Sequence, residues 1–438
     1  MLNVRMNNSK ITIYVVSCWI FAAFGGLMFG YDIGISGGVS AMDDFLIKFF
    51  PHWDFTGYVV VGAVLSAVAE NKLMLIFGRI LFGVGVGVGF ENETVPLFLT
   101  EVAPIQHRGA VNIMFQLFVT IGIFIANLVN YGTSIIHPNG WRMSLGFAAI
   151  PAVILFIGSF VITDTPTSLV ERGNEEQRKS TLVKIRGVSD VEAEYKEIVA
   201  ACEQAKQVKQ HSLKNLLKPA SIPPLVIGVL LQVFQQFTGI NAIMFYAPVL
   251  FQTMGFKANA SLLSSVITGI VNVGSTFVSI YLVDKVGRRK LLLQACCQML
   301  ISQLAIGTIL VTSLSETGTL NRTLAAIVVL LVCTYVMSFA WSWGPLGWLI
   351  PSETFPLETR TTGFAFAVST NMLFTSIIAQ LFLTMLCTMK AYIFFFFSGW
   401  IVVMGLFVFF FLPETKGVPI DSMVERLWMQ HPIWKRLF

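Results

Sequence analysis

The chain has 438 residues, of which 55% are hydrophobic and only 12% are charged, and its mean hydropathy is +0.74. This composition indicates an all-α polytopic membrane protein, because each bilayer crossing needs a helix of about 20 apolar residues. The net charge of +5 does not indicate nucleic acid as a partner, since the basic residues gather in loops and at the end of the chain, as the positive-inside rule expects. The sequence has no metal-ligand cluster, nucleophile–base arrangement or phosphate-binding glycine loop, so we expect neither an enzyme nor a metal site. Its six cysteines show no zinc or redox spacing and are interpreted as structural thiols.

Eleven apolar segments follow one another along the chain, with the ranges 12–39, 55–69, 73–98, 111–131, 142–163, 222–252, 260–282, 291–313, 323–350, 361–387 and 391–412. A polar stretch between the fifth and the sixth carries ten Lys and Arg and nine Asp and Glu. We therefore expect two membrane halves and two cytoplasmic parts. They are an N-terminal half (1–163), a linker with short helices (164–221), a C-terminal half of six helices (222–412) and a tail (413–438).

The first apolar segment contains an acidic residue, Asp32, within a run of glycines that allows close helix packing. No small-residue cleavage pattern follows this segment, so we expect it to stay as the first membrane helix. An ionised carboxylate in a membrane is costly unless it is paired, and a nearby cation can therefore switch its proton occupancy.

The two halves repeat a charged motif. Glu101 and Arg108 form Glu-x6-Arg at the exit of one apolar segment and the entry of the next, and Glu353 and Arg360 do the same in the second half. One such motif could arise by chance, but two matched ones favour a duplicated fold. Internal repeats are typical of secondary transporters, whose substrate binds between the halves.

A third charged motif, Asp284-Lys-Val-Gly287-Arg288-Arg289-Lys290, joins the seventh and eighth segments. Gly287 permits a tight turn, and Arg288 and Arg289 can hold acidic groups and helix C-termini at the cytoplasmic face. The alternative is that these residues are only the anchor that the positive-inside rule expects.

The sixth segment places Gln235, Gln236 and Asn241 around Gly239 in an otherwise apolar sequence. Amides in hydrocarbon must find partners, and Gly239 can let the helix open so that backbone groups also line a cavity. This predicts a binding site for a polar, uncharged ligand. The alternative is that the amides only hold helices together.

Polar residues recur at helical spacing in two further segments, so that each has one polar stripe on an apolar helix. The stripes are Ser265, Thr268, Asn272, Thr276 and Ser279 in the seventh segment, and Gln116, Thr120 and Asn127 in the fourth. A water-filled cavity is the least costly environment for such stripes.

Several motifs together resemble the sugar porters of the major facilitator superfamily, most closely the plant monosaccharide–proton symporters of the STP family. They are Gly30-Tyr-Asp32-Ile-Gly34, the Asp284–Arg289 turn, Gln235-Gln236-x4-Asn241, Trp341-Ser-Trp-Gly-Pro-Leu-Gly-Trp348 with Pro351-Ser-Glu353, and Pro413-Glu414-Thr-Lys-Gly417. The resemblance implies two helical halves around a central cavity. It implies sugar-binding roles for Gln116, Gln235, Gln236, Asn241, Asn272, Trp348 and Asn371. It also makes the Glu-x6-Arg motifs, the Asp284–Arg289 turn and Glu414 a cytoplasmic gate.

The resemblance pairs Asp32 with Arg79, which matches an arginine on the fourth helix of similar symporters. Our hypothesis is that Asp32 carries the proton and Arg79 tunes its pKa; a static structural salt bridge is the alternative. Only 47 positions separate the two residues, which leaves no room for the family's second helix at about 20 residues per crossing. Either the chain is a shortened twelve-helix carrier, or 55–69 does not span normally.

Two further features depart from the family pattern. The run Gly83–Gly89 is one Gly-Val longer than usual, and Glu91 and Glu93 place two carboxylates beyond it. We predict monosaccharide–proton symport by alternating access, with a monosaccharide such as glucose as substrate, protons as the coupling ion, the lipid bilayer as partner and no further cofactor. Facilitated sugar diffusion and a non-transporting, sugar-binding membrane protein or decayed copy are the alternatives. The resemblance implies the plasma membrane as location.

Overall fold

The computed structural model of the chain describes the following residues: 16–17, 19–20, 23–24, 26–27, 31, 62–87, 99, 108–133, 136, 140–151, 153–154, 183, 199, 215–241, 243, 258–317, 322–356, 359–416, 418 and 423–437. All regular secondary structure within these ranges is helical. Most of the expected linker, together with Asp32, Glu91, Glu93 and Glu101, lies outside them.

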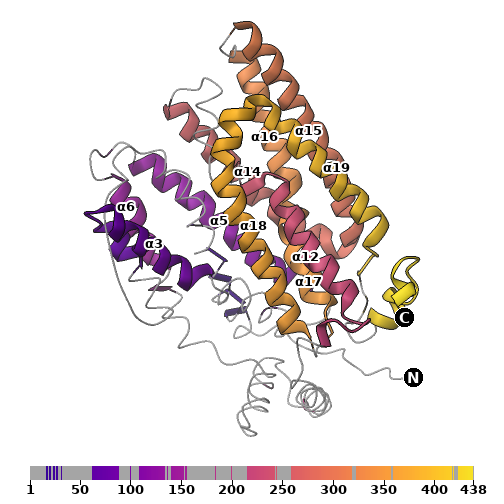
Figure 1. Ribbon diagram of the computed structural model, residues 1–438. Helices are drawn as coiled ribbons and strands as arrows, with labels where there is room; N and C mark the ends of the chain where they lie inside the picture. Colours follow the sequence, from indigo (N-terminus) through magenta and orange to yellow (C-terminus); the bar gives the residue numbers. More distant parts are fainter. Residues whose placement is uncertain are drawn as a thin grey trace.

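The described N-terminal helices are α3 (Lys72–Gly87), α5 (Arg108–Thr133) and α6 (Gly140–Gly146), and α3 and α6 lie together at one side of the molecule (Figure 1). Residues 62–67 are also helical, and the chain turns at 68–71 before α3 begins. The described part of the second apolar segment is therefore a short helix that leads directly into α3.

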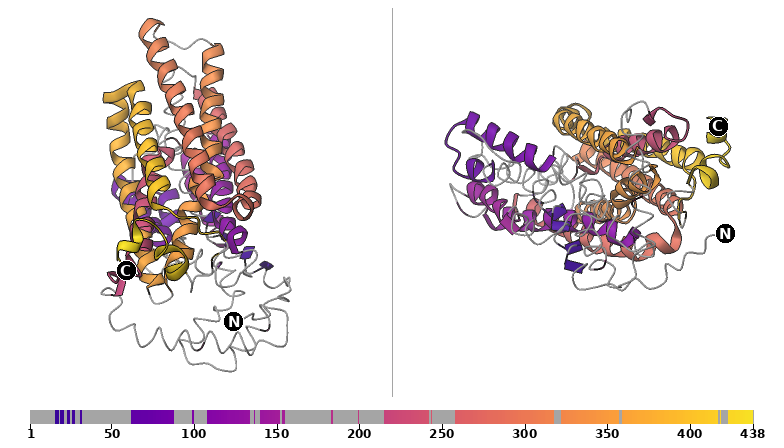
Figure 2. Two further views of the ribbon diagram at one scale, coloured as in Figure 1. Left: turned by 90° about the vertical axis from the view of Figure 1, so that its right-hand side faces the viewer. Right: turned by 90° about the horizontal axis from the view of Figure 1, so that it is seen from below.

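The C-terminal helices form the larger bundle, which two further views show from the side and from below (Figure 2). They are α12 (Ile222–Phe237), α14 (Ala258–Val286), α15 (Arg288–Thr317), α16 (Arg322–Ala340), α17 (Trp343–Thr354), α18 (Arg360–Met389) and α19 (Ile393–Phe411). A 3-10 turn at Lys390–Tyr392 joins α18 to α19, and a π turn at Val424–Trp428 and a 3-10 turn at Trp434–Leu437 follow α19. The described residues of this half are thus mostly helical.

Six described stretches are long and apolar enough to cross a membrane: Ala110–Thr133, Ser264–Val286, Arg288–Thr312, Thr323–Thr354, Thr362–Phe382 and Thr384–Phe411. They overlap six of the expected segments, and α12 is a shorter apolar helix within a seventh. The chain is therefore an all-helical, multi-pass membrane protein, as predicted. The number of eleven segments stays a prediction.

Two of the apolar segments contain a helix break. Helix α12 begins with two prolines in its first turn, where a missing N–H costs nothing, and it ends at Phe237. Gly239 then adopts a φ of +82°, a conformation that favours glycine. In the ninth segment, a turn at Trp341 and Ser342 separates α16 from α17, and the Ser342 hydroxyl donates to the Ser338 carbonyl at 2.6 Å.

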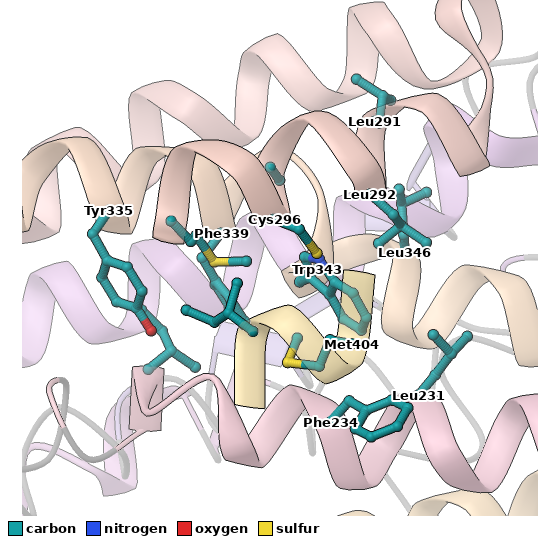
Figure 3. Close-up of a cluster of buried hydrophobic side chains, with 14 of the residues drawn as sticks. Leu231, Phe234, Leu291, Leu292, Cys296, Tyr335, Phe339, Trp343, Leu346 and Met404 are labelled. Carbon is teal, nitrogen blue, oxygen red and sulfur yellow. The ribbon is translucent and has the colours of Figure 1, made fainter. Parts of the chain in front are cut away.

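A buried apolar cluster joins α12, α15, α16, α17 and α19 (Figure 3). Trp343 is fully buried at its centre, among Leu231, Phe234, Cys296 and Met404. Lipid is as apolar as these side chains, so van der Waals packing rather than escape from water holds such a bundle together. This packing holds the apolar side of α12 in place and so fixes the positions of its polar side chains.

The two halves touch along α5 and α14. A Cβ on Gly269 of α14 would lie 3.1 Å from the Phe124 ring of α5, so the absence of a side chain there allows close approach. Nearby, the Asn127 amide donates to the Ser265 carbonyl at 3.4 Å. Helix α5 therefore belongs to the N-terminal half in sequence but packs against the C-terminal half.

Candidate functional site

A cluster of three buried amides links α12 to α17 and α18. Asn371 Nδ2 donates to Gln232 Oε1 at 2.6 Å and to Gln235 Oε1 at 2.8 Å. Gln232 Nε2 donates to the Gly347 carbonyl at 2.8 Å. Gln235 Nε2 donates to the carbonyls of Trp343 and Gly344, at 2.9 and 3.1 Å. These bonds use the N–H donors of Gln235 and Asn371 and leave acceptor capacity on their oxygens, because an amide oxygen has two lone pairs.

Gln232 was not among the predicted site residues. It is fully buried and lies three residues before Gln235, on the same face of the helix. That spacing was the signal in the sequence, because a glutamine one turn before two others extends the polar face of α12.

The break after α12 separates two predicted ligands that remain in contact. Gln236 precedes Gly239 and Asn241 follows it, and Asn241 Nδ2 donates to Gln236 Oε1 at 2.6 Å. Thr238 caps the break, since its hydroxyl donates to the Gln235 carbonyl at 2.7 Å and accepts from the Ile240 N–H at 3.2 Å. The prediction that the helix opens at Gly239 is confirmed.

The N-terminal half reaches this cluster through α5. Gln116 Nε2 is 3.4 Å from the position that a Cβ on Gly344 would occupy. Gln116 therefore lies beside Gly344, whose carbonyl accepts a hydrogen bond from Gln235. Phe115 packs edge-on against Trp348, with 6.4 Å between ring centroids. The predicted ligands Gln116, Gln235 and Trp348 thus come from both halves and meet around α17.

The polar stripe on α14 is buried, whereas Ile270 and Phe277 on the same helix are more than half exposed. The stripe consists of Ser265, Thr268, Asn272, Thr276 and Ser279, and each is at most 4% exposed. The stripe therefore faces the protein interior, and its exposure to a water-filled cavity stays a prediction. The Asn272 side chain takes part in none of the hydrogen bonds described above, and its role as a sugar ligand stays a prediction.

Only one member of the predicted proton-coupling pair is described. Arg79 is half-buried on α3 and lies near Tyr31. The Tyr31 hydroxyl donates to the Ser144 carbonyl at 3.0 Å, and the hydroxyls of Ser144 and Thr133 share a hydrogen bond of 2.6 Å. Since Asp32 lies outside the described residues, its pairing with Arg79 stays a prediction.

Charged groups of the C-terminal half converge on the turn between α14 and α15. Arg288 pairs with Asp284 at 3.1 Å and with Glu353 at 3.3 Å. The Glu414 carboxylate accepts from the backbone N–H of Arg288 and of Arg289, at 2.8 and 3.2 Å. These contacts occupy the N-terminus of α15, where negative charge is favourable.

Two further features complete this turn. Gly287 has a φ of +100°, and a Cβ there would lie 2.6 Å from Glu414 Oε2. Arg289 donates to the Phe409 carbonyl near the end of α19 at 2.6 Å, and Arg360 is buried at the start of α18. The arginine pair thus holds acidic groups and a helix C-terminus, as expected. Arg108 begins α5, while Glu101 lies outside the described residues, so the role of the first Glu-x6-Arg motif stays a prediction.

Comparison with known proteins gives consistent matches over almost the whole chain. A family model described as "Sugar (and other) transporter" matches residues 55–428. The chain is 58% identical to Sugar transport protein 6 of Arabidopsis thaliana, over 98% of this chain and 94% of the relative. It is 54% identical to Sugar transport protein MST4 of Oryza sativa subsp. japonica, over 98% and 93%.

A solved structure of the proton:xylose symporter XylE bound to 6-bromo-6-deoxy-D-glucose has the same fold. Its TM-score is 0.78 at 24% identity, and the match covers 96% of this chain and 100% of that one. The match to Sugar transport protein 6 spans 480 positions, although this chain has only 438 residues. At least 42 of those positions, the difference between the two lengths, are therefore gaps in this chain.

Proposed function

Because the chain belongs to the sugar transporter family, we propose that it carries a monosaccharide, such as a hexose, together with a proton across the membrane by alternating access. The observation that supports this proposal most directly is the meeting of Gln235 of one half and Gln116 of the other beside Gly344. A substrate bound there touches both halves, which alternating access requires.

The chemistry of the site suits a sugar. Each sugar hydroxyl both donates and accepts a hydrogen bond, as amides do, and the C–H face of the ring can stack on an aromatic side chain such as Trp348. The N–H groups of Gln235 and Asn371 already bind carbonyl oxygens. We therefore expect a sugar to donate hydroxyl protons to their oxygens and leave the helix contacts intact.

Proton coupling is the finer part of the proposal. Asp32 would carry the proton, and Arg79, which lies beside Tyr31, would favour the ionised form of the carboxylate. The proton is the coupling ion, and we propose neither a further cofactor nor a nucleic-acid partner nor an enzymatic activity. The protein would act in the plasma membrane.

Two other functions are compatible with the same site. If Asp32 and Arg79 were locked as a pair, the protein would be a facilitative sugar carrier. The second is a non-transporting protein that binds sugar, and it is favoured by the gap of at least 42 positions relative to Sugar transport protein 6. The expected loss of the second helix would account for part of these gaps.

Uptake of labelled hexose distinguishes these functions. The full chain is expressed in cells without hexose carriers of their own, and uptake is normalised to the amount of protein at the cell surface. Symport predicts uptake that a proton uncoupler abolishes, and facilitated diffusion predicts uptake that resists it. Sugar binding without uptake, at normal surface amounts, would reject both transport functions.

A further inference from the structure

Gln232 of α12 lies outside the predicted set of sugar ligands, yet a proline of α17 determines how its amide is oriented. Helix α12 packs against both α17 and α18 (Figure 1). In a regular helix the Gly347 carbonyl would accept from the N–H of residue 351, but Pro351 has no N–H. This carbonyl accepts from Gln232 Nε2 at 2.8 Å instead. Because a carbonyl cannot donate, the nitrogen of the Gln232 amide must face Gly347, and its oxygen must face the other way.

The same reasoning fixes the orientation of the neighbouring amide. Gln235 Nε2 donates to the carbonyls of Trp343 and Gly344, at 2.9 and 3.1 Å. A Cβ on Gly347 would lie 2.8 Å from this nitrogen, so the absence of a side chain there allows the close approach. Both N–H groups of Gln235 therefore bind groups that can only accept, and its oxygen is left to face Asn371.

Asn371 of α18 receives its own orientation from these two glutamine oxygens. Its nitrogen donates to Gln232 Oε1 at 2.6 Å and to Gln235 Oε1 at 2.8 Å, so both of its N–H groups are used. A reversed Asn371 amide would lose both bonds and bring its oxygen against two other oxygens. The Thr375 hydroxyl donates to Asn371 Oδ1 at 3.4 Å, which leaves one lone pair of this oxygen for a further donor.

The face of α18 that carries Asn371 lies beside the aromatic side chain on which the sugar is expected to stack. Trp348 packs against Val368, which lies one turn before Asn371 on the same face of α18. Phe115 of α5 also packs against Trp348. A sugar ring on Trp348 would therefore lie next to Asn371, between the two halves of the protein.

We propose that Gln232 is a positioning residue that sets the specificity of the sugar site, because it makes Asn371 present its oxygen, and not its N–H groups, to the substrate. This inference rests on the proposed function, which makes a sugar the ligand. One hydroxyl of the sugar must then donate to Asn371 Oδ1, and a substituent that can only accept, such as fluorine, cannot replace it. A site built around such a bond rejects analogues that lack the donor, since its own polar group is left unpaired.

Fluorinated glucoses test the direction of this hydrogen bond. The dissociation constants of glucose and of each monodeoxyfluoro-glucose are measured by calorimetry on the purified full chain. At one ring position at least, we expect fluorine to weaken binding roughly 5- to 150-fold, the effect of leaving one buried acceptor unpaired. If every fluorinated glucose binds as tightly as glucose, no hydroxyl needs to donate in the site and the proposal is overturned.

Gln232→Met connects this discrimination to Gln232. The variant keeps the length of the side chain but frees one N–H of Asn371, so the site gains a donor that can bind fluorine. At the position where fluorine weakens binding, we expect the ratio of the two dissociation constants, fluorinated to unsubstituted, to fall toward 1. A purely structural role of Gln232 would weaken the binding of both sugars alike, so an unchanged ratio overturns the positioning role.

The matched control is Gln298→Met, which removes an amide with the same bonding pattern from α15. Gln298 also donates to a backbone carbonyl on another helix, that of Thr334 at 3.3 Å, and it accepts from another amide, that of Gln294 at 2.9 Å. This variant should keep the wild-type ratio. If it lowers the ratio as much as Gln232→Met does, the effect is a general loosening of the bundle and the proposal is wrong.

A double-mutant cycle gives a readout that needs no sugar. The unfolding temperatures of Gln232→Met, Asn371→Ala and the double variant are compared with that of the wild type. We expect the double variant to lose less than the sum of the two single losses, because both single changes remove the same hydrogen bond. Additive losses would show that Gln232 does not hold Asn371. A wild type that binds no glucose defeats the proposed function instead, and the cycle still decides whether Gln232 positions Asn371.

Discussion

Replacing Asn371 by alanine distinguishes an amide that holds helices together from one that only binds sugar. Its side chain is 2% exposed, and its two bonds, of 2.6 and 2.8 Å, reach Gln232 and Gln235 on another helix. Interhelical hydrogen bonds in membranes contribute about 0.6 kcal/mol on average and about 1.7 kcal/mol at most. Two such bonds predict a loss of about 1–3 kcal/mol in the free energy of unfolding. This loss should be present before any sugar is added.

Thermal unfolding of the purified, sugar-free protein measures this effect. Asn371→Ala should unfold at a lower temperature than the wild type. The matched control is Gln430→Ala, which removes an exposed amide whose hydrogen bond to the Glu425 carbonyl is 3.5 Å long, and it should unfold like the wild type. If Asn371→Ala unfolds at the wild-type temperature but loses sugar affinity, Asn371 is only a ligand and the amide cluster does not hold α12 to α18.

Three further predictions concern charges and the cytoplasmic side. Asp32→Asn should abolish the pH dependence of hexose uptake, and retained pH dependence would reject Asp32 as the proton carrier. Gly287→Ala should lower the unfolding temperature by the equivalent of about 1–3 kcal/mol. The reason is that φ is +100° at this residue and the new Cβ would meet the Glu414 carboxylate. Wild-type stability would show that the turn can rearrange. Partial burial, and to a smaller extent the charge of Arg289, lowers the pKa of His431 below its ordinary 6.5. An undocked tail therefore binds the proton more readily, so the contribution of His431 to docking is fully present above pH 6.5 and is lost as the pH falls through the lowered pKa. Hydrogen exchange of residues 423–437 at pH 7.5 and 5.5 should show this change, and His431→Gln should remove it.

The long apolar segments could be predicted closely from the sequence. Helices α14, α15, α18 and α19 begin and end within a few residues of the expected ranges, because about 20 consecutive apolar residues have few alternatives to a membrane helix. The opening at Gly239 was also predictable, since a glycine among amides favours it. The turn at Trp341 and Ser342 was not predicted, because hydropathy does not distinguish one long helix from two shorter ones.

The hydrogen-bond partners of the site residues could not be predicted from the sequence, for a different reason. Gln235 and Asn371 could each be recognised as polar residues that avoid lipid, but their partners lie on other helices. Gln235 binds the Trp343 carbonyl, which lies at the start of α17 after the unpredicted turn. Gln232 was missed although its position one turn before Gln235 places it on the same helix face, because its partners, the Gly347 carbonyl and Asn371, lie on other helices.

The amide cluster has a consequence for how the protein is made. Helix α12 emerges from the ribosome with Gln232 and Gln235 on one face, but their partner Asn371 follows 139 and 136 residues later. At about 5–20 residues per second, synthesis of that stretch takes roughly 7–28 s. During this time the new helix carries polar groups that lipid cannot satisfy. We therefore expect α12 to remain beside the insertion machinery or a membrane chaperone until α17 and α18 arrive, and its integration to be a late step in biogenesis.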